Sequence, residues 1–417
     1  MKTNTLTRNI LIALVTGILC GWLVNLYAGS AERAAEIANY LSIVTEVFLR
    51  LIKMIIAPLV LSTLTLGIAH MGGGGAVGRT FGRTMAWFIT ASVVSLALGI
   101  LMVNILQPGV GVGLAVPPVN ADSGVAAKAF DLKAFVSHIV PQSIFEAMAT
   151  NEVLQIVVFS LFAGIGLISI GEQGRPIIRG LDALMHLMLR ITGYVMQIAP
   201  LAVFAAVASS IAVEGLSIII VFGRFIGGFY LALALLWVVL LGAGSFVIGI
   251  PNIKRLVMEI REPFLITFAT ASSEASYPKL LEALERFGVP NRIASFVLPL
   301  GYSFNLDGSM MYCAFASIFI AQAYGIDLTL GQEFAMLGLL MITSKGIAGV
   351  PRASLVVIAA TLPYFNIPEA GLLLVLAVDH FLDMGRSATN VIGNAVATAV
   401  VAKWDKEAPE VLLPGEA

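Results

Sequence analysis

One helix near the carboxyl end of the chain constrains the fold most, because it carries a row of polar side chains along an otherwise apolar segment. The segment covers residues 379–403. At about 100° per residue, its charged, hydroxyl and amide side chains fall within a fan of roughly 100°. They are Asp379, Asp383, Arg386, Ser387, Asn390 and Asn394.

A row of this kind is costly in hydrocarbon, so it must face protein or a water-filled cavity, and it predicts a functional site. The opposite side of the helix is apolar and includes Leu382, Val391 and Ile392. The structural alternative is an Asp383–Arg386 ion pair that only holds helices together. The remaining hydroxyl and amide groups exceed what one ion pair needs, which favours the functional interpretation.

The composition indicates an integral membrane protein. The chain has 417 residues, of which 59% are hydrophobic and 12% charged, and its mean hydropathy is +0.95. Soluble domains carry about 25% charged residues, and apolar stretches of about 20 residues cross a bilayer as helices. The net charge of −1 gives no indication of a nucleic-acid partner. Cys20 and Cys313 lie in apolar segments, so we expect reduced cysteines without a disulfide.

The apolar runs predict an all-α polytopic protein of the cell (inner or plasma) membrane. The expected early spans are residues 9–27, 41–70, 85–106, a broken span between 131 and 170, 175–211 with a break at Ala199-Pro200, and 216–248. We expect residues 31–39 to form an outer loop and residues 72–83 a basic turn. Residues 1–8 are short and basic, and they predict a retained first span and no cleaved signal.

Two later segments are interrupted in the middle. Polar residues and Pro278 interrupt the first (about 252–284), and a stretch at 344–352 with glycine and proline interrupts the second (about 329–363). Their halves are too short to span a bilayer, and unwound backbone at that depth must be surrounded by protein or line a cavity. The pair therefore predicts two re-entrant hairpins at the binding site of a secondary transporter. A span at 293–324, broken at 303–309, lies between them.

The distribution of Lys and Arg predicts the orientation. With the amino terminus inside, the cytoplasmic side collects most of the basic residues, whereas the outer side receives Arg33, Lys128 and Lys133. Both termini are then cytoplasmic, and the two hairpins enter from opposite sides. Hairpins of opposite entry, each followed by a spanning helix, predict an inverted repeat.

Four motifs in this order resemble one family, the dicarboxylate/amino acid:cation symporters, which include glutamate and aspartate transporters. They are Ser-Ser-Glu-Ala-Ser at 272–276, Asn-Leu-Asp-Gly-Ser at 305–309, Gly-Val-Pro at 349–351 and the polar row of the last helix. Weaker similarity covers nearly the whole chain. Each motif alone is weak, whereas four in this order are specific.

The resemblance implies a homotrimer whose protomers each have eight transmembrane helices and two re-entrant hairpins, in a glutamate-transporter-like elevator fold. Residues 1–84 (spans one and two) and 109–213 (spans four and five) would form a static scaffold. Residues 85–108 (span three) and 214–417 (span six, hairpin 1, span seven, hairpin 2 and span eight) would form a sliding transport domain. Periodicity alone predicts neither the trimer nor this motion.

The resemblance also implies the substrate site. Arg386 matches the arginine that grips a side-chain carboxylate, a role suited to its planar fork of donors. Asp383 matches the carboxylate that accepts the substrate ammonium, and Asn390 and Ser387 match groups that hold the backbone carboxylate and ammonium. The rest of the expected pocket is Ser272, Ser273 and Ser309, with Gly349, Val350 and Ser354 in an outer gate.

Asp383 favours an acidic amino acid, aspartate or glutamate, as the imported substrate, because a plain dicarboxylate has no ammonium to pair with it. The alternative is a C4-dicarboxylate symporter for succinate, malate or fumarate.

Several positions depart from the sodium-coupled pattern of the family. Asn394 stands where an aspartate is expected, and Leu306 replaces a thioether donor. Lys345 lies close in sequence to carbonyls that would surround a sodium ion, so its ammonium could stand in for that ion.

These departures lead us to expect coupling to H+, with no other cofactor. Glu274 adds a carboxyl group that, once removed from water, can carry a proton. The alternative is Na+ at a residual site formed by Asn305 and Asp307, with the hydroxyl groups of Ser92 and Ser303 near it.

Two other classes are weaker alternatives. An intramembrane hydrolase could use Ser272 or Ser273 with a histidine, yet the hairpins and span seven contain no histidine and no Gly-x-Ser-x-Gly motif. A channel needs an open pore, whereas a double hairpin suits a closed binding site. We therefore expect a transporter and not an enzyme.

Overall fold

The computed structural model describes residues 3–69, 74–111, 117–118, 132–215, 222–343, 353–376 and 378–405. Within these ranges the regular elements are helices, which confirms the all-α prediction. The elements of the first half are α1 (Thr3–Tyr27), α2 (Ala31–Ala69), α3 (Gly74–Leu106), α4 (Leu132–Ile139), α5 (Ile144–Ala149), α6 (Val153–Ile170), η1 (Gly171–Gly174), α7 (Arg175–Val195) and α8 (Ala199–Glu214).

The second half contains the interrupted segments and the polar helix. Its elements are α10 (Gly223–Ile248), α11 (Ile250–Glu259), α12 (Arg261–Thr270), η2 (Glu274–Ser276), α13 (Tyr277–Phe287), α14 (Asn291–Phe304), α15 (Asp307–Ala323), α16 (Leu330–Thr343), α17 (Ala353–Thr361), η4 (Leu362–Phe365), η5 (Glu369–Gly371), α18 (Leu372–Leu376) and α19 (Asp379–Trp404).

Two expected connections are helical instead, so the predictions of a loop and a turn there are wrong. Residues 31–39 form the first turns of α2, because this stretch is rich in alanine and carries an acidic residue near the helix start. Residues 74–83 belong to α3, whose start is held against the end of α19 by hydrogen bonds from Thr80 and Arg83 to Asp405. The predicted boundary at residue 85 therefore falls inside a helix.

The predicted interruptions of the first hairpin and of span seven are confirmed. α12 ends where Ala271 adopts the left-handed conformation, with φ of 50°, and α13 begins only at Tyr277. Pro278 suits the first turn of α13, because a backbone N–H at that position has no partner within the helix. Residues 305–306 separate α14 from α15.

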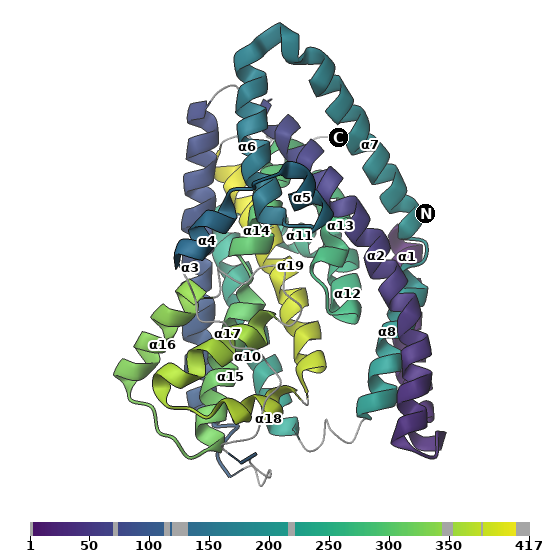
Figure 1. Ribbon diagram of the computed structural model, residues 1–417, viewed down its shortest axis with the longest axis vertical. Coiled ribbons are helices and arrows are strands. Elements are labelled where there is room, and N and C mark those ends of the chain that lie inside the picture. Colours follow the sequence, from purple (N-terminus) through teal and green to yellow (C-terminus); the bar gives the residue numbers. More distant parts are fainter. Residues whose placement is uncertain are drawn as a thin grey trace.

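Six stretches of the described chain are long and apolar enough to cross a membrane, which confirms the prediction of a membrane protein. They are Arg8–Tyr27, Ala31–Ala69, Val77–Leu106, Val153–Val195, Gly223–Ile248 and Asn291–Ala323. The fourth is bent, because α6 and α7 meet at an angle at η1 (Figure 1). Exposed aromatic side chains such as Phe162 and Phe246 suit contact with lipid. The count of eight spans stays a prediction.

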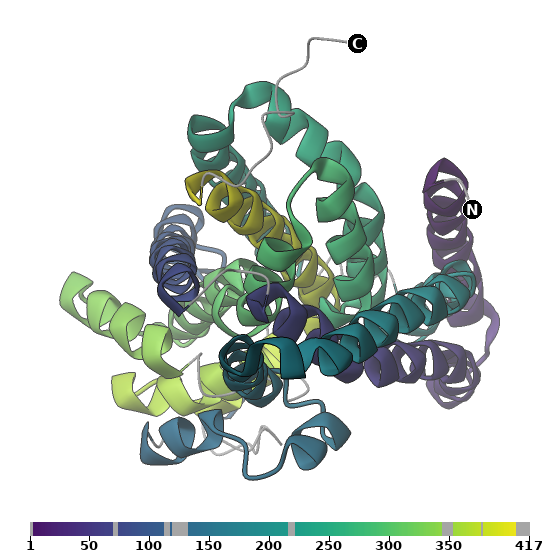
Figure 2. The same ribbon diagram turned by 90° about the horizontal axis from the view of Figure 1, so that it is seen from above.

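The polar helix α19 runs through the centre of the molecule (yellow in Figure 1) and packs against α10, α12, α14 and α15. Two buried apolar clusters meet on it. One joins α1, α2, α6 and α8 to α12–α14 and the carboxyl half of α19, and the other joins α3 and α10 to α15–α18. Figure 2 shows α1 at the periphery, where it packs along α8. Asp379, Arg386, Asn390 and Asn394 of α19 are thus buried inside protein.

Gly164 on α6 permits close packing on α2. A Cβ atom there would lie 2.6 Å from Cβ of Ile68 and 3.1 Å from the carbonyl oxygen of Thr65. We expect Gly164→Ala to lower stability by about 1–3 kcal/mol, as overpacking usually does, measured by thermal unfolding in detergent. Gly166→Ala on the same helix, where a Cβ meets nothing within 4 Å, is the matched control. Equal melting temperatures for the two variants would contradict this packing.

Candidate functional site

Arg386 is the centre of the site on α19. Its Nε donates to Asp383 Oδ1 at 2.7 Å and its Nη1 donates to Asp379 Oδ1 at 3.0 Å. The side chain of Arg386 is only 3% exposed, whereas that of Asp383 is 26% exposed. The two bonds use two of the five N–H donors of a guanidinium, which leaves donors for the carboxylate of a ligand.

Tyr312 completes the surroundings of the guanidinium. The Arg386 guanidinium lies over the tyrosine ring at 4.5 Å from its centroid, an arrangement in which the ring face attracts a cation. The Tyr312 hydroxyl donates to Asp379 Oδ1 at 2.8 Å. Asp379 is therefore a buried structural partner of the arginine, while the more exposed Asp383 is available to a ligand.

Asn390 lies one turn beyond Arg386 on α19 and connects this helix by hydrogen bonds to the turn of the first hairpin and to the start of α15. Its Oδ1 accepts from the backbone N–H of Gly308 at 2.9 Å. Its Nδ2 donates to the hydroxyl oxygens of Ser309 at 3.3 Å and Ser273 at 3.5 Å. Ser387 donates to Asp383 Oδ1 at 3.0 Å. The structure thus brings the turn of the first hairpin and the start of α15 to the polar row.

A second polar cluster lies deeper, around the break between α14 and α15. Asn305 Nδ2 donates to Asp307 Oδ2 at 3.2 Å and to Asn394 Oδ1 at 3.1 Å. Ser95 on α3 donates to Asp307 Oδ1 at 3.2 Å. Asn305 Oδ1 and Asn394 Nδ2 are buried without a hydrogen-bond partner. Oxygen atoms of this kind suit a hard cation, whereas the Asn394 amide N–H group does not.

Two glycines make room for these contacts. A Cβ atom on Gly308 would lie 2.2 Å from the carbonyl oxygen of Arg386, and one on Gly393 would lie 1.9 Å from Asp307 Oδ2. A side chain at either position would displace the start of α15 from α19. Glycine is therefore required at positions 308 and 393 for α15 and α19 to meet at the site.

The other predicted residues lie in different settings. The Ser92 hydroxyl is 3.5 Å from the carbonyl oxygen of Phe304, next to the deeper cluster. The Ser272 hydroxyl accepts locally from the backbone N–H of Ala275 at 3.4 Å. Ser303 is buried near the end of α14.

Part of the second hairpin lies outside the described residues. Lys345, Gly349 and Val350 belong to this part, as does the interruption expected at 344–352. Ser354 at the start of α17 is buried, and its carbonyl oxygen is 3.8 Å from Cys313 Sγ on α15. Helix α17 of the second hairpin therefore packs on α15 close to Tyr312.

Glu274 lies apart from both polar clusters. It lines a small cavity with Ile56 and Val60 of α2 and Val153 of α6. Tyr277, Pro299 and Tyr302 of the second half line the same cavity, so Glu274 lies between the two halves of the chain.

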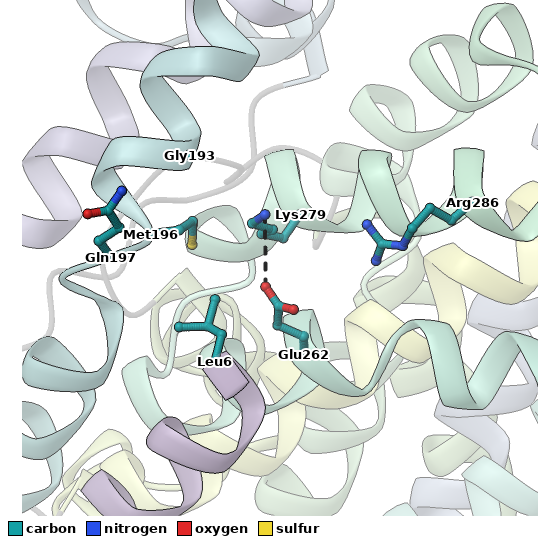
Figure 3. A pocket seen from close by; sticks show the side chains of 7 residues that line it. All are labelled: Leu6, Gly193, Met196, Gln197, Glu262, Lys279 and Arg286. Atoms are coloured by element: carbon teal, nitrogen blue, oxygen red, sulfur yellow. Dashed lines mark ion pairs between the residues drawn. The ribbon is translucent and has the colours of Figure 1, made fainter. Parts of the chain in front are cut away.

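A further cavity is also separate from the polar row. It has a volume of about 120 Å³ at the base of the first hairpin and is lined by Leu6, Gly193, Met196, Gln197, Glu262, Lys279 and Arg286 (Figure 3). Lys279 Nζ and Glu262 Oε1 face each other there at 4.0 Å. None of the predicted substrate residues lines it, so it is not the predicted pocket.

The structure adds three residues to the predicted site, namely Asp379, Tyr312 and Ser95. Asp379 was part of the polar row, and its spacing of seven from Arg386 places it on the same helix face. Ser95 follows Ser92 by one helical turn, which is a usable signal. Tyr312 is separated from α19 by many residues, and no local pattern in the sequence indicates its contact with Arg386.

Comparison with known proteins shows which family the chain belongs to. The profile of the sodium:dicarboxylate symporter family matches residues 6–404. The chain belongs to this family. The family predicted from the four sequence motifs is thereby confirmed.

Named relatives of the symporter cover both substrate classes that the sequence left open. The proton/sodium-glutamate symport protein of Geobacillus stearothermophilus is 37% identical over 415 residues, which cover 97% of this chain and 96% of that protein. The proton/glutamate-aspartate symporter of Escherichia coli (strain K12) is 38% identical over 409 residues, covering 96% and 93%. The C4-dicarboxylate transport protein of Laribacter hongkongensis is 37% identical over 413 residues, covering 97% and 91%.

The two acidic partners of Arg386 should contribute differently to the stability of the symporter. Removing one partner from a buried ion pair costs about 3–5 kcal/mol, so Asp379→Asn should lower the melting temperature strongly. Asp383 is partly exposed, and solvent screening makes Asp383→Asn the milder change. Thermal unfolding in detergent compares the two variants. A larger loss for Asp383→Asn would contradict the structural role of Asp379.

Proposed function

We propose that this symporter imports acidic amino acids, aspartate or glutamate, together with a cation, and that H+ is favoured over Na+. One observation carries the substrate assignment: Arg386 and Asp383 lie side by side, in contact through Nε and Oδ1 at 2.7 Å. A guanidinium binds a carboxylate and a carboxylate accepts from an ammonium, so the pair matches the charged groups of an acidic amino acid.

In this proposal each residue of the row has one task. Arg386 offers its remaining donors to the side-chain carboxylate of the substrate. Asp383 accepts from the ammonium, since its side chain is the more exposed of the two acids. Asn390 and Ser387 hold the remaining polar atoms of the substrate. The pocket is completed by Ser272, Ser273 and Ser309, and by an outer gate that contains Gly349, Val350 and Ser354.

The second candidate is transport of C4-dicarboxylates. The similarity to a C4-dicarboxylate transport protein supports it, because that relative is as similar to this chain as one of the glutamate symporters. A dicarboxylate could use Arg386 but has no ammonium for Asp383. We favour the amino acid for that reason.

The deeper cluster supports protons as the coupling ion. Both oxygens of Asp307 accept hydrogen bonds, and an amide of Asn394 stands where a second carboxylate would strengthen a sodium site. Glu274 is the proposed proton carrier, and Lys345 is proposed to replace an ion. One relative is named for both proton and sodium, so a sodium site at Asn305 and Asp307 is the alternative.

The proposed motion follows the division of the chain given by the family resemblance. Residues 1–84 and 109–213 form the scaffold, and residues 85–108 and 214–417 slide against it with the substrate. We propose a homotrimer in the cell membrane with both termini in the cytoplasm. Family membership over residues 6–404 supports this arrangement.

Arg386→Ala tests the substrate assignment. Truncating one partner of a buried charge pair costs about 2–5 kcal/mol of binding free energy, so aspartate binding should be lost. Isothermal titration calorimetry of purified, monodisperse protein measures the affinity. Arg386→Lys keeps the charge without the planar fork and should bind more weakly than the parent but better than the alanine variant.

Unchanged aspartate affinity in Arg386→Ala would contradict the assignment. Asp383→Asn serves as the control that retains the arginine. It should lose aspartate and still bind succinate, whereas parental aspartate affinity in this variant would favour the C4-dicarboxylate alternative.

A further inference from the structure

The two arms of the first hairpin are joined by a buried hydrogen bond close to the turn. Thr267 of α12 donates from its hydroxyl group to the hydroxyl oxygen of Ser276 in η2, at 2.6 Å. Both residues are fully buried. At the base of the hairpin, the ion pair between Glu262 and Lys279 spans 4.0 Å and lies beside the cavity. The bond near the turn is therefore the tighter of these two links between the arms.

The Thr267 hydroxyl is directed differently from other buried threonine hydroxyls of this protein. Thr270, Thr389 and Thr398 each donate to the carbonyl oxygen four residues earlier, at 2.7–2.8 Å. Such a bond satisfies the hydroxyl group within its own helix and involves no other element. Thr267 instead donates to the other arm of the hairpin. Its hydroxyl group therefore contributes to the shape of the hairpin and not to α12 alone.

The Ser276 hydroxyl continues this connection into the turn. It donates to the backbone carbonyl oxygen of Ser273 at 3.0 Å, and the backbone N–H of Ser276 donates to the same oxygen at 3.2 Å. The Ser273 hydroxyl oxygen in turn accepts from Asn390 of α19 at 3.5 Å. A chain of hydrogen bonds thus leads from α12 through the turn to the polar row.

The turn needs such support, because one of its residues has a costly backbone conformation. Ala271 has φ of 50°, in the left-handed region that is unfavourable for a residue with a Cβ atom. It directly precedes the two serines of the turn, Ser272 and Ser273. A backbone held in this region keeps its conformation only where the surrounding contacts fix it. The bond from Thr267 to Ser276 is such a contact.

We propose that Thr267 and Ser276 are positioning residues for substrate binding, which fix the turn so that the Ser273 hydroxyl faces Asn390 and the substrate. Within the described residues, the hydrogen bonds of both hydroxyl groups stay inside the hairpin, so they act on the pocket through Ser273. The inference rests on the proposed function, because it takes Ser273 as part of the pocket for an acidic amino acid. It adds that a buried hydroxyl pair behind the pocket sets the affinity.

Thr267→Val tests the first member of the chain, because it removes the hydroxyl group at nearly constant size. The aspartate dissociation constant in calorimetry should rise by about five- to tenfold, the change expected for the loss of one buried hydrogen bond. Thr267→Ser keeps the hydroxyl group and should bind nearly as tightly as the parent. Ser276→Ala interrupts the chain at its second member and should weaken binding to a similar extent as Thr267→Val.

Thr270→Val is the matched control. Thr270 lies on the same helix and is also buried, but its hydroxyl group donates to the carbonyl oxygen of Ile266 within α12. This variant loses a bond of the helix alone, so its aspartate affinity should equal that of the parent. An equal loss of affinity in Thr270→Val and Thr267→Val would show a general effect of damage to α12 and would overturn the proposal.

A double-mutant cycle separates positioning from a merely structural role. In Ser273→Ala the hydroxyl group that is positioned has been removed, so adding Thr267→Val should change the aspartate affinity much less than it does in the parent. A loss as large as in the parent, or parental affinity in Thr267→Val itself, would overturn the proposal. Failure of the proposed function would appear separately, as absent aspartate binding in the parent protein.

Discussion

The burial of one guanidinium group is the constraint on which the rest of the site depends. Arg386 is almost entirely removed from solvent, and an uncompensated charge there would be strongly destabilising. Asp379, Asp383 and the ring of Tyr312 provide the compensation. The helices that carry these groups must therefore stay in register, which explains why α19 is central and why α15 begins beside it.

The same region also depends on close backbone approach. The break at residues 305–306 turns the start of α15 toward α19, so that the backbone N–H of Gly308 reaches Asn390. Gly393 leaves space for the carboxylate of Asp307. Backbone geometry and charge are thus linked, because a shift of α15 would disturb the arginine pair and the deeper amide cluster together.

Helical periodicity explains how much of this could be predicted from the sequence. The row on α19 is regular, so the positions of Asp383, Arg386 and Asn390 followed from their spacing. Polar groups within apolar segments predicted the interruption of the first hairpin at Ser272 and Ser273 and the break of span seven at residues 305–306. The contact between Tyr312 and Arg386 could not be predicted from the sequence, because it depends on how two separate helices pack. Glu274 lies in a turn, where no period indicates the direction of a side chain.

Uptake of labelled aspartate into proteoliposomes tests the central claim most directly. The protein is reconstituted and given an inward proton gradient without sodium, then a sodium gradient without a proton gradient. We expect uptake with the proton gradient alone, because the proposed function assigns the proton to Glu274 and a weakened sodium site to Asn394. Uptake that requires sodium would show that the Asn305–Asp307 site binds the coupling ion. Transport of succinate without transport of aspartate would contradict the role assigned to Asp383.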